Sequence, residues 1–248
     1  MLVQEIVAGL VNYLQKYETF MKEILKNLDI DTIIPHGGGI ESAAAVAWAK
    51  RLGLNPLIVS IAMGDVPKVN HTIEAVKKQA KHFNVPVHIE RNTMPMTKLD
   101  VPTGDFFLDM CTRLVLGNPQ WHIKYVVFGT NSEDSMNQRM TLRNFQRILA
   151  GRWGLQYDLH GMQFGLFKKI PQILFPFEYL TKSEIIGIMA THDREVLKIV
   201  WTCTNPINGK PCRQCHKCIE YAAAKNTARR AKKKIQEGEI YGHGLQDM

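Results

Sequence analysis

The sequence predicts an α/β fold with a doubly wound, mostly parallel sheet and a C-terminal helical segment. Short β-branched runs alternate with segments of helical periodicity between residues 31 and 130, and this alternation is typical of βαβ units. The sheet that such units build is covered by helices on both faces. With 248 residues, 45% of them hydrophobic and 22% charged, the chain can bury a full core in the manner of an ordinary globular protein.

The elements follow one another in a regular order. Apolar residues recur at helical spacing in three segments, which are predicted to be helices: residues 2–28, 42–52 and 71–83. Four apolar, β-branched runs are predicted to be strands: DTIIP (31–35), PLIVSIA (56–62), VPVHIE (85–90) and IKYVVFGT (123–130).

Three of the predicted strands end in segments suited to bind a ligand. In parallel α/β sheets, ligands bind where strands end and helices begin. Gly37 to Ser42, Ala62 to Asp65 and Gly129 to Asp134 all lie at such ends, so we expect them to converge on one crevice. The composition shifts near Trp201, where cysteines and turn residues begin to dominate. We therefore expect three parts: an N-terminal amphipathic helix (1–30), a core domain (31–200) and a C-terminal segment (201–248).

The charge of the chain favours anionic partners. Lys and Arg exceed Asp and Glu by 31 − 23 = 8, and six of the thirteen residues in AKNTARRAKKKIQ (224–236) are basic. We predict that this basic tail is a solvated helix end, and a contact with nucleic acid is the alternative. No apolar run approaches the ~20 residues that cross a bilayer, and Glu5 interrupts the N-terminus too early for a signal peptide. We expect a cytoplasmic protein without membrane attachment.

Three glycines follow the first predicted strand in IIPHGGGIES (33–42). A strand, a glycine turn and a helix N-terminus form an anion site, because unpaired backbone N–H groups and the helix dipole point at the ligand. No Lys follows these glycines as a P-loop requires, and Ser42 stands where the dinucleotide fingerprint needs its third glycine. With these two motifs excluded, the remaining pattern consists of two glycines, the acidic Glu41 and the hydroxyl of Ser42. A purely structural turn is the alternative.

Four of the five cysteines form a C-x8-C-x2-C-x2-C cluster: Cys203, Cys212, Cys215 and Cys218. Four thiolates satisfy tetrahedral Zn²⁺ with no open position, as in structural sites. An Fe–S cluster uses the same ligands and stays an alternative, whereas disulfides are not expected without a secretion signal. His216 is surplus to the four thiolates and is predicted to be an exposed loop residue, and Cys111 a buried apolar one.

The glycine loop resembles the S-G-G-x-D-S loop of the PP-loop ATP pyrophosphatases, which cleave ATP to AMP and pyrophosphate. Gly38, Gly39 and Ser42 match that pattern, while Gly37 and Glu41 replace its Ser and Asp. Together with the cysteine cluster, the chain resembles the 7-cyano-7-deazaguanine synthase family from about residue 31 to 221. The further segments that carry the resemblance are HTIE (71–74), VPTGDFFL (101–108), FGTNSEDS (128–135), LTKSEI (180–185) and WTC (201–203).

The resemblance implies an adenine nucleotide alpha hydrolase-like fold and a ligase of queuosine biosynthesis. Such a ligase uses ATP, Mg²⁺ and ammonia to convert the carboxylate of a carboxydeazaguanine to an amide and then a nitrile. It implies catalytic roles for Glu41, Ser42 and Lys182. It implies contact with ATP for Gly37, Gly38, Gly39, Ser42, Ile61, Ala62, Met63 and Gly129. Without the resemblance, the helix-start signals favour a solvated Lys182 with Thr181 as helix cap.

The acceptor side departs from the family. Gly104 stands in place of an Arg, and SMNQRMTL (135–142) replaces the family's deazapurine-binding segment. Asn131 and Asp134 would face the acceptor or, as the alternative, only cap a helix. Arg139 and Arg143 would substitute as carboxylate clamps, because a guanidinium pairs bidentately with a carboxylate.

Two alternatives therefore stay open beside the small-molecule ligase. The chain would be a divergent enzyme that adenylates a tRNA base or a protein carboxylate, or a nucleotide- or nucleic-acid-binding module without catalysis. Family members are often dimers, so a homodimer is a further open possibility.

Overall fold

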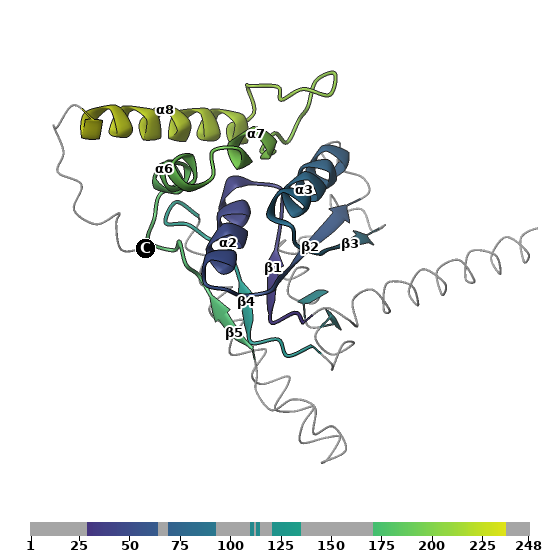
Figure 1. Cartoon of the computed structure of the whole chain (residues 1–248). Helices are drawn as coiled ribbons and strands as arrows, with labels where there is room; N and C mark the ends of the chain where they lie inside the picture. The colour runs from purple at the N-terminus through teal and green to yellow at the C-terminus, as the bar shows by residue number, and fades with distance from the viewer. Residues whose placement is uncertain are drawn as a thin grey trace, which may run out of the picture.

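The computed structural model describes residues 29–63, 69–92, 110–111, 113–114, 121–134 and 171–236. Within these ranges the chain forms a parallel five-stranded sheet in the order β3-β2-β1-β4-β5 (Figure 1). The strands are β1 (Thr32–Pro35), β2 (Pro56–Met63), β3 (Val87–Asn92), β4 (Tyr125–Val127) and β5 (Gln172–Leu174). The helices are α2 (Ile40–Arg51), α3 (Val69–Phe83), α6 (Lys182–His192), α7 (Val196–Ile199) and α8 (His216–Gln236).

The predicted α/β class and parallel sheet are confirmed, with differences at the edges. β5 was not predicted, because a run of three residues carries too little pattern to distinguish it from a loop. Only Tyr125–Val127 of the predicted strand 123–130 joins the sheet, where it pairs with β1 and β5. Helix α2 begins at Ile40, two residues before the expected start. The predicted helix over residues 2–28 lies outside the described residues.

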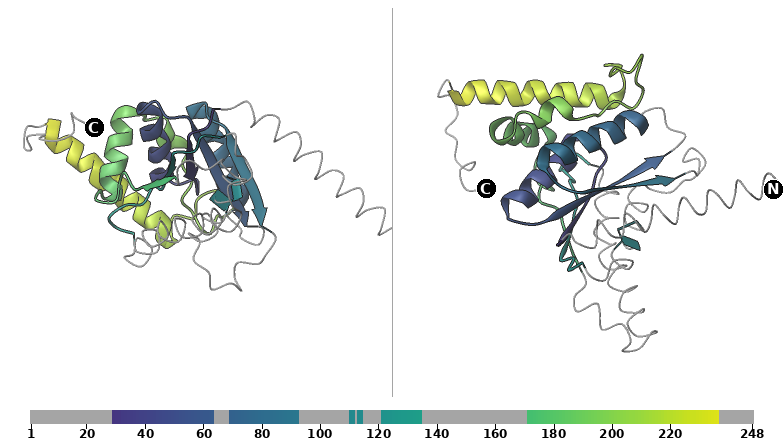
Figure 2. Two further views of the ribbon diagram at one scale, coloured as in Figure 1. Left: turned by 90° about the horizontal axis from the view of Figure 1, so that it is seen from below. Right: turned by 45° about the vertical axis from the view of Figure 1, so that its right-hand side comes forward.

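The sheet is buried on both faces, as the apolar strands predict. Successive residues of the central strands point to opposite sides: Ile33 belongs to one hydrophobic cluster and Ile34 to the other. Helices α2, α3, α6 and α7 contribute to the cluster around Ile34 (Figure 2). The cluster around Ile33 includes Met110 and the buried Cys111, as expected for that cysteine.

Helix α2 lies deep in the fold because its residues are small. Ala43, Ala44, Ala45 and Ala49 are buried together with Val46, and alanine lets the sheet and helix α6 approach the helix axis closely. Alanine is also the best helix former. The same sequence therefore specifies the helix and its burial, and it aims the helix N-terminus at the carboxyl edge of the sheet.

The strand order places a topological switch point at β1. Helix α2 leads from β1 to its neighbour β2, while β4 lies on the other side of β1. The chain thus runs in opposite directions from β1 and from β4. At such a switch point the connections diverge and leave room for a ligand beyond the carboxyl ends of the strands. The glycine loop follows β1, and residues 129–134 follow β4.

The C-terminal segment packs on the core. Three residues of α8 pack against the cluster around Ile34: Tyr221, Ala224 and Ala228. Helix α8 also packs against α6 (Figure 1). In the part of the chain that the structure describes, no helix is both long and apolar enough to span a membrane. The three-part division of the chain stays a prediction.

Candidate nucleotide site and metal centre

The glycine loop turns sharply after β1. Gly38 has a φ of +78°, a conformation that a Cβ atom strongly disfavours. A Cβ there would also lie 3.3 Å from the carbonyl oxygen of Thr72. At Gly37, by contrast, no described atom lies within 4 Å of the Cβ position. The turn thus requires glycine at 38 but has space for a side chain at 37.

The peptide groups of Gly38 are held by side chains from distant parts of the chain. Its N–H donates to Nδ1 of His36 at 3.0 Å. Its carbonyl accepts from Nε2 of Gln79 at 3.0 Å and from the backbone N–H of Trp201 at 2.9 Å. Three bonds of ordinary length hold the two peptide groups that flank the Gly38 Cα in place. The loop is therefore built in one conformation before any ligand arrives.

His36 is a neutral acceptor inside the loop. Burial lowers its pKa to about 3, although the Gln79 side chain opposes the shift. With Nδ1 accepting from Gly38, the ring proton resides on Nε2. Nε2 of His36 and Oε1 of Gln79 are buried and have no hydrogen bond of ordinary geometry among the described residues.

The N-terminus of α2 lies directly after the glycine turn, at the carboxyl end of β1. Gly39 is the N-cap residue, with no side-chain cap bond in the described structure, and Ala43 is the first residue that donates back to it. The N–H groups of the intervening first turn have no intrahelical acceptor. The Ser42 hydroxyl donates to the Gly39 carbonyl at 3.2 Å and lies 3.3 Å from Nδ1 of His36. Unpaired donors at a helix N-terminus form an anion site.

Gly129 allows β4 to approach this helix N-terminus. A Cβ on Gly129 would lie 2.5 Å from the carbonyl carbon and oxygen of Glu41 and 2.7 Å from the amide nitrogen of Ser42. No side chain fits there without moving one backbone from the other. Gly129 is therefore a packing requirement of the site, and a contact to ATP stays a prediction.

Lys182 lies at the same place but comes from another element. It is the first residue of α6 and is 5% exposed. Thr181 caps the helix through a reciprocal capping box with Glu184, as the helix-start signals predict. The alternative of a solvated Lys182 is wrong, because its side chain is buried and pairs with Glu41 of α2 and Glu220 of α8. Its Nζ lies 2.8 Å from Oε1 of Glu41 and also donates to Glu220 of α8.

The two carboxylates keep Lys182 charged. Burial opposes its charged form, but Glu41 and Glu220 outweigh that effect and raise the pKa of Lys182. In return, burial disfavours the carboxylate of Glu220, while Lys182 and Lys217 reverse this and lower the pKa of Glu220. A buried cation with one partner on the glycine loop is held at the position where phosphate charge would enter.

Asn131 and Asp134 shape the segment after β4. Asn131 is buried, and its Oδ1 accepts from the N–H of Glu133 while its Nδ2 lies 3.4 Å from Glu41. Asp134 accepts from the backbone N–H of Asn131 at 2.8 Å. The Glu133 carboxylate in turn accepts from the backbone N–H of Lys182. These bonds fold a tight turn against α6, and contact with an acceptor substrate stays a prediction.

The other predicted site residues are less closely tied to the loop. Ile61, Ala62 and Met63 form the carboxyl end of β2, at the same edge of the sheet as the glycine loop. Arg139 and Arg143 lie outside the described residues, as do VPTGDFFL (101–108) and SMNQRMTL (135–142).

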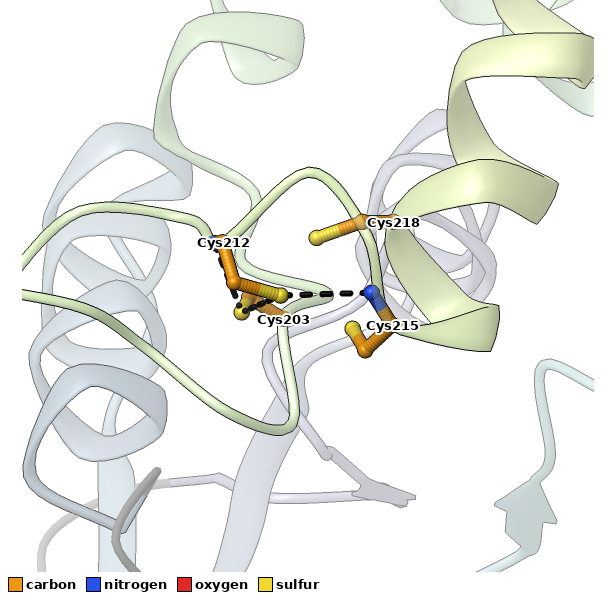
Figure 3. A group of neighbouring side chains, drawn as sticks. All are labelled: Cys203, Cys212, Cys215 and Cys218. Atoms are coloured by element: carbon orange, nitrogen blue, oxygen red, sulfur yellow. Dashed lines mark hydrogen bonds between the residues drawn. The ribbon is translucent and has the colours of Figure 1, made fainter.

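The four cysteines of the cluster come together at the start of α8. Their sulfur atoms all lie within 4.8 Å of one another, and Figure 3 shows the side chains turned toward a common centre. The loop reaches this geometry through three residues with positive φ: Asn208, Gly209 and Arg213. His216 is exposed, as predicted, but it is the first residue of α8 rather than a loop residue.

The spacing of the sulfurs fits a single tetrahedral ion. Sγ of Cys203 and Sγ of Cys212 lie 3.6 Å apart, and bonds of about 2.3 Å to one tetrahedral ion place sulfurs roughly 3.8 Å apart. In a 4Fe–4S cluster each thiolate binds a different iron, so the sulfurs spread further apart. The backbone N–H groups of Cys212 and Cys215 also donate to the sulfurs of Cys203 and Cys212.

The backbone N–H groups that donate to the cysteine sulfurs favour the thiolate, which is the form that binds metal. Hydrogen bonds from Thr204 lower the pKa of Cys215 to about 5, and a backbone bond from Gln214 lowers the pKa of Cys212. Burial instead raises the pKa of Cys218 to about 12. A cation bound at the centre would overcome that burial, since coordination deprotonates a thiol.

Sequence reasoning missed three residues of the site: His36, Gln79 and Glu220. A histidine before a glycine turn is a weak signal that was available. Gln79 carried one signal as well, because it lies on the apolar face of α3 beside Val76 and Ala80. Glu220 gave none, because its role depends on where α8 crosses α6.

Several solved structures are similar to the chain, with low sequence identities and low TM-scores. A U34-tRNA thiolase NcsA from Methanococcus maripaludis with its 4Fe–4S cluster is 12% identical, with 90% of this chain and 77% of that chain covered and a TM-score of 0.44. An NMN synthetase from Francisella tularensis is 13% identical, with 90% and 94% covered and a TM-score of 0.40. An NH3-dependent NAD synthetase from Campylobacter jejuni is 17% identical, with 94% and 97% covered and a TM-score of 0.35.

Neither a protein-family profile nor a curated protein sequence matches the chain. At TM-scores below 0.5, the structural likenesses assign neither a fold family nor an activity to it. The function of the chain is therefore argued from the geometry of the site.

Proposed function

We propose that the chain is an ATP pyrophosphatase of the PP-loop type that adenylates a carboxylate and transfers it to ammonia. The observation that carries this proposal is the pairing of two features at the switch point of the sheet. One is the N-terminus of α2, which has no side-chain cap among the described residues, and the other is the buried, charged Lys182 beside it. A helix N-terminus and a fixed cation together suit a polyphosphate better than a monovalent anion.

The residues would divide the work as follows. N–H groups of Gly39 and of the first turn of α2 bind the β- and γ-phosphates, and the Ser42 hydroxyl donates to a phosphate oxygen. Lys182 leaves Glu41 and neutralises the charge that builds on pyrophosphate as the substrate carboxylate attacks the α-phosphate. Adenine lies along the end of β2 at Ile61 to Met63.

The expected substrate is a carboxydeazaguanine. Its carboxylate oxygen displaces pyrophosphate from ATP, and ammonia then displaces AMP from the acyl adenylate to give an amide. Adenylation of the amide oxygen by a second ATP, followed by loss of AMP and a proton, gives the nitrile. Asn131, Asp134, Arg139 and Arg143 are the residues that we expect on the acceptor side.

The proposal includes two metal ions. Mg²⁺ would supply charge neutralisation when ATP is bound, and the Glu41 carboxylate at the loop would help to hold it. Zn²⁺ fits the four-cysteine centre as a structural ion, because four thiolates leave no open coordination position. The centre lies at the base of α8 and fixes the end of the fold.

The direct test is to incubate the metal-loaded protein with ATP, Mg²⁺, ammonium and carboxydeazaguanine. We expect release of pyrophosphate and AMP, with an amide or nitrile that chromatography and mass spectrometry identify. Lys182→Met should slow pyrophosphate release about 10²- to 10³-fold. ATP binding without pyrophosphate release would favour the binding-module alternative. Pyrophosphate release that depends on a different acceptor would leave the enzyme class standing and refute the substrate.

A tRNA or other nucleic-acid acceptor is the second candidate, and the surface of α8 favours it. Lys225, Arg229 and Arg230 are exposed, and no acidic residue follows Glu220 in this helix. In gel-shift titrations with tRNA, Arg229→Gln with Arg230→Gln should weaken binding and lower the salt slope by roughly 2, since each phosphate contact contributes about one. Unchanged binding in this double variant would exclude the surface as the contact.

A further inference from the structure

The metal centre contacts the glycine loop by two separate routes. One route begins at Cys203, the first cysteine of the centre, and reaches Gly38 through Trp201. The other begins at Cys218, the last cysteine, and reaches Glu41 through Glu220 and Lys182. We propose that Trp201 and Glu220 are positioning residues through which the four-cysteine centre sets the conformation of the glycine loop and hence its affinity for nucleotide. This inference rests on the proposed function for its nucleotide.

The Trp201 route is made of direct contacts. The indole Nε1 donates to the carbonyl of Cys203 at 2.9 Å, so the ring is tied to the cysteine loop. The ring also stacks on His71 of α3, with centroids 4.5 Å apart and planes inclined by 19°. With its side chain fixed on two sides, Trp201 presents its backbone N–H to the Gly38 carbonyl at 2.9 Å.

The Gly38 peptide depends on this bond because of its conformation. Glycine reaches a φ of +78° about as readily as a negative φ, so its own backbone does not select this conformation and the surrounding bonds hold it there. The Gln79 side chain supplies the other donor to the Gly38 carbonyl and also donates to the Ile199 carbonyl, two residues before Trp201. Movement of the segment from Ile199 to Cys203 would therefore weaken both bonds to Gly38.

The Glu220 route acts on the other half of the loop. Cys218 lies in the first turn of α8, and Glu220 follows it two residues later on the same helix. The Glu220 carboxylate accepts from Nζ of Lys182, which also contacts Glu41 in the first turn of α2. A metal bound by Cys215 and Cys218 would fix the start of α8, and with it the distance from Glu220 to Lys182.

The consequence is that metal occupancy and nucleotide affinity are coupled. A structural ion that only stabilised the fold would leave the affinity of the folded protein unchanged. If the ion also orders the loop, its removal raises the Kd for ATP in protein that remains folded, because the loop must then be ordered during binding.

The experiment compares four full-length proteins: metal-loaded wild type, wild type stripped with a chelator, Trp201→Ala and Glu220→Gln. Metal content is measured by elemental analysis, folding by circular dichroism, and ATP binding by calorimetry with Mg²⁺ and without acceptor. We expect both variants to retain one ion per chain and to bind ATP roughly tenfold more weakly, the size of one lost hydrogen bond. Stripped protein that remains folded should lose at least as much affinity.

A control separates positioning from general damage. Trp201→Phe retains the stack on His71 but loses the bond to Cys203, so its affinity should lie between those of wild type and Trp201→Ala. Trp48→Phe makes the same change in α2, on its partly buried face, and should bind ATP as wild type does. Wild-type affinity in Trp201→Ala, Glu220→Gln and the stripped protein would overturn the inference.

A second readout does not need nucleotide. Amide hydrogen exchange in peptides that cover residues 36–42 and 199–203 should accelerate when the metal is removed and in Trp201→Ala, even without ATP. If wild type shows this coupling but binds no ATP, the proposed function fails and the positioning role stands. If wild type binds ATP but exchange in the loop ignores the metal, the positioning role fails and the proposed function stands.

Discussion

The metal centre and the glycine loop lie side by side but are assembled in different ways. The four cysteines come from one segment, residues 203–218, and close on a point through turns within that segment. The glycine loop instead takes its support from Gln79, Lys182 and Trp201, which lie on three other parts of the chain. A local site can form with its own segment, whereas the loop acquires its shape only when the whole sheet and its helices are in place.

This difference has consequences for mutation. A change in the centre removes one ligand of a local cluster, so its direct effect is on metal affinity. A change in the loop's support acts at a distance, through buried charges and backbone contacts whose loss is not repaired by neighbouring residues. Substitutions in the metal centre should therefore change metal affinity, whereas substitutions around the glycine loop should change ATP binding, turnover or stability.

The largest effect is expected from Lys182→Met. The substitution removes the only buried lysine among the described residues and leaves Glu41 and Glu220 facing each other. Loss of one fixed charge at a transition state typically costs about 10²- to 10³-fold in rate, and pyrophosphate release measures it. Thermal stability should also fall, and adding Glu41→Gln should restore stability but not turnover. Near-normal turnover in Lys182→Met would contradict the role of this cation.

Cys212→Ser should act on the metal rather than on catalysis directly. Structural zinc sites bind with about 10–16 kcal/mol in total, so loss of one of four thiolates should lower affinity roughly 100-fold. Competition with a chromophoric chelator measures this. Cys111→Ala is the matched control, since Cys111 is buried in the core and away from the centre, and it should retain one ion per chain. Equal metal affinity in the two variants would refute a four-thiolate centre.

Gly129→Ala tests the contact between β4 and α2. The added methyl must push the Glu41 peptide away, which should lower the free energy of unfolding by about 1–3 kcal/mol and weaken ATP binding. Gly187→Ala is the opposite case: the Cβ position meets no described atom within 4 Å, and alanine in a helix gains up to about 1 kcal/mol. Chemical denaturation should therefore move the two variants in opposite directions.

Stability should depend on pH through the ion pairs of Lys182. The pKa of Glu220 is lowered in the fold, so its contribution is present above the ordinary value near 4.3 and is lost as the pH falls through the lowered pKa. The pKa of Lys182 is raised, so its contribution is present below about 10.4 and is lost as the pH rises through the raised pKa.

Glu220→Gln should therefore flatten the acid limb of the unfolding free energy. Glu195→Gln removes an exposed partner of Lys198 and should change that limb little, because exposed pairs contribute little. Parallel acid limbs in wild type and Glu220→Gln would contradict a stabilising carboxylate at this position.

The smallest effect is expected from Gly37→Ser. The Cβ position is open and the backbone there has no positive φ, so stability should change by less than about 0.5 kcal/mol. The serine hydroxyl would add a donor to the loop, and ATP affinity should stay equal or improve. A marked loss of ATP affinity would mean that the loop binds a ligand of a different shape.

Much of the fold was predictable from local pattern. The β-branched runs and the helices between them were correct in type, because their periodicity reflects burial directly. The start of α6 was also predictable, since Thr181 and Glu184 form the capping box from adjacent residues. β5 and the short ladder of β4 were not, because pairing across a sheet depends on a neighbour that is distant in sequence.

The residues of the site also divide into those set by local sequence and those set by tertiary packing. By itself the sequence determined the four cysteines, the glycine turn and the helix that follows it, because each lies within a few residues of its partners. Only the tertiary structure decided that Lys182 is buried, that Trp201 and Gln79 hold the Gly38 peptide, and that Glu220 reaches across from α8. These contacts join segments 38 to 163 residues apart along the chain (220 − 182 = 38; 201 − 38 = 163). Their existence depends on the packing of α6 and α8 against the sheet rather than on any local pattern.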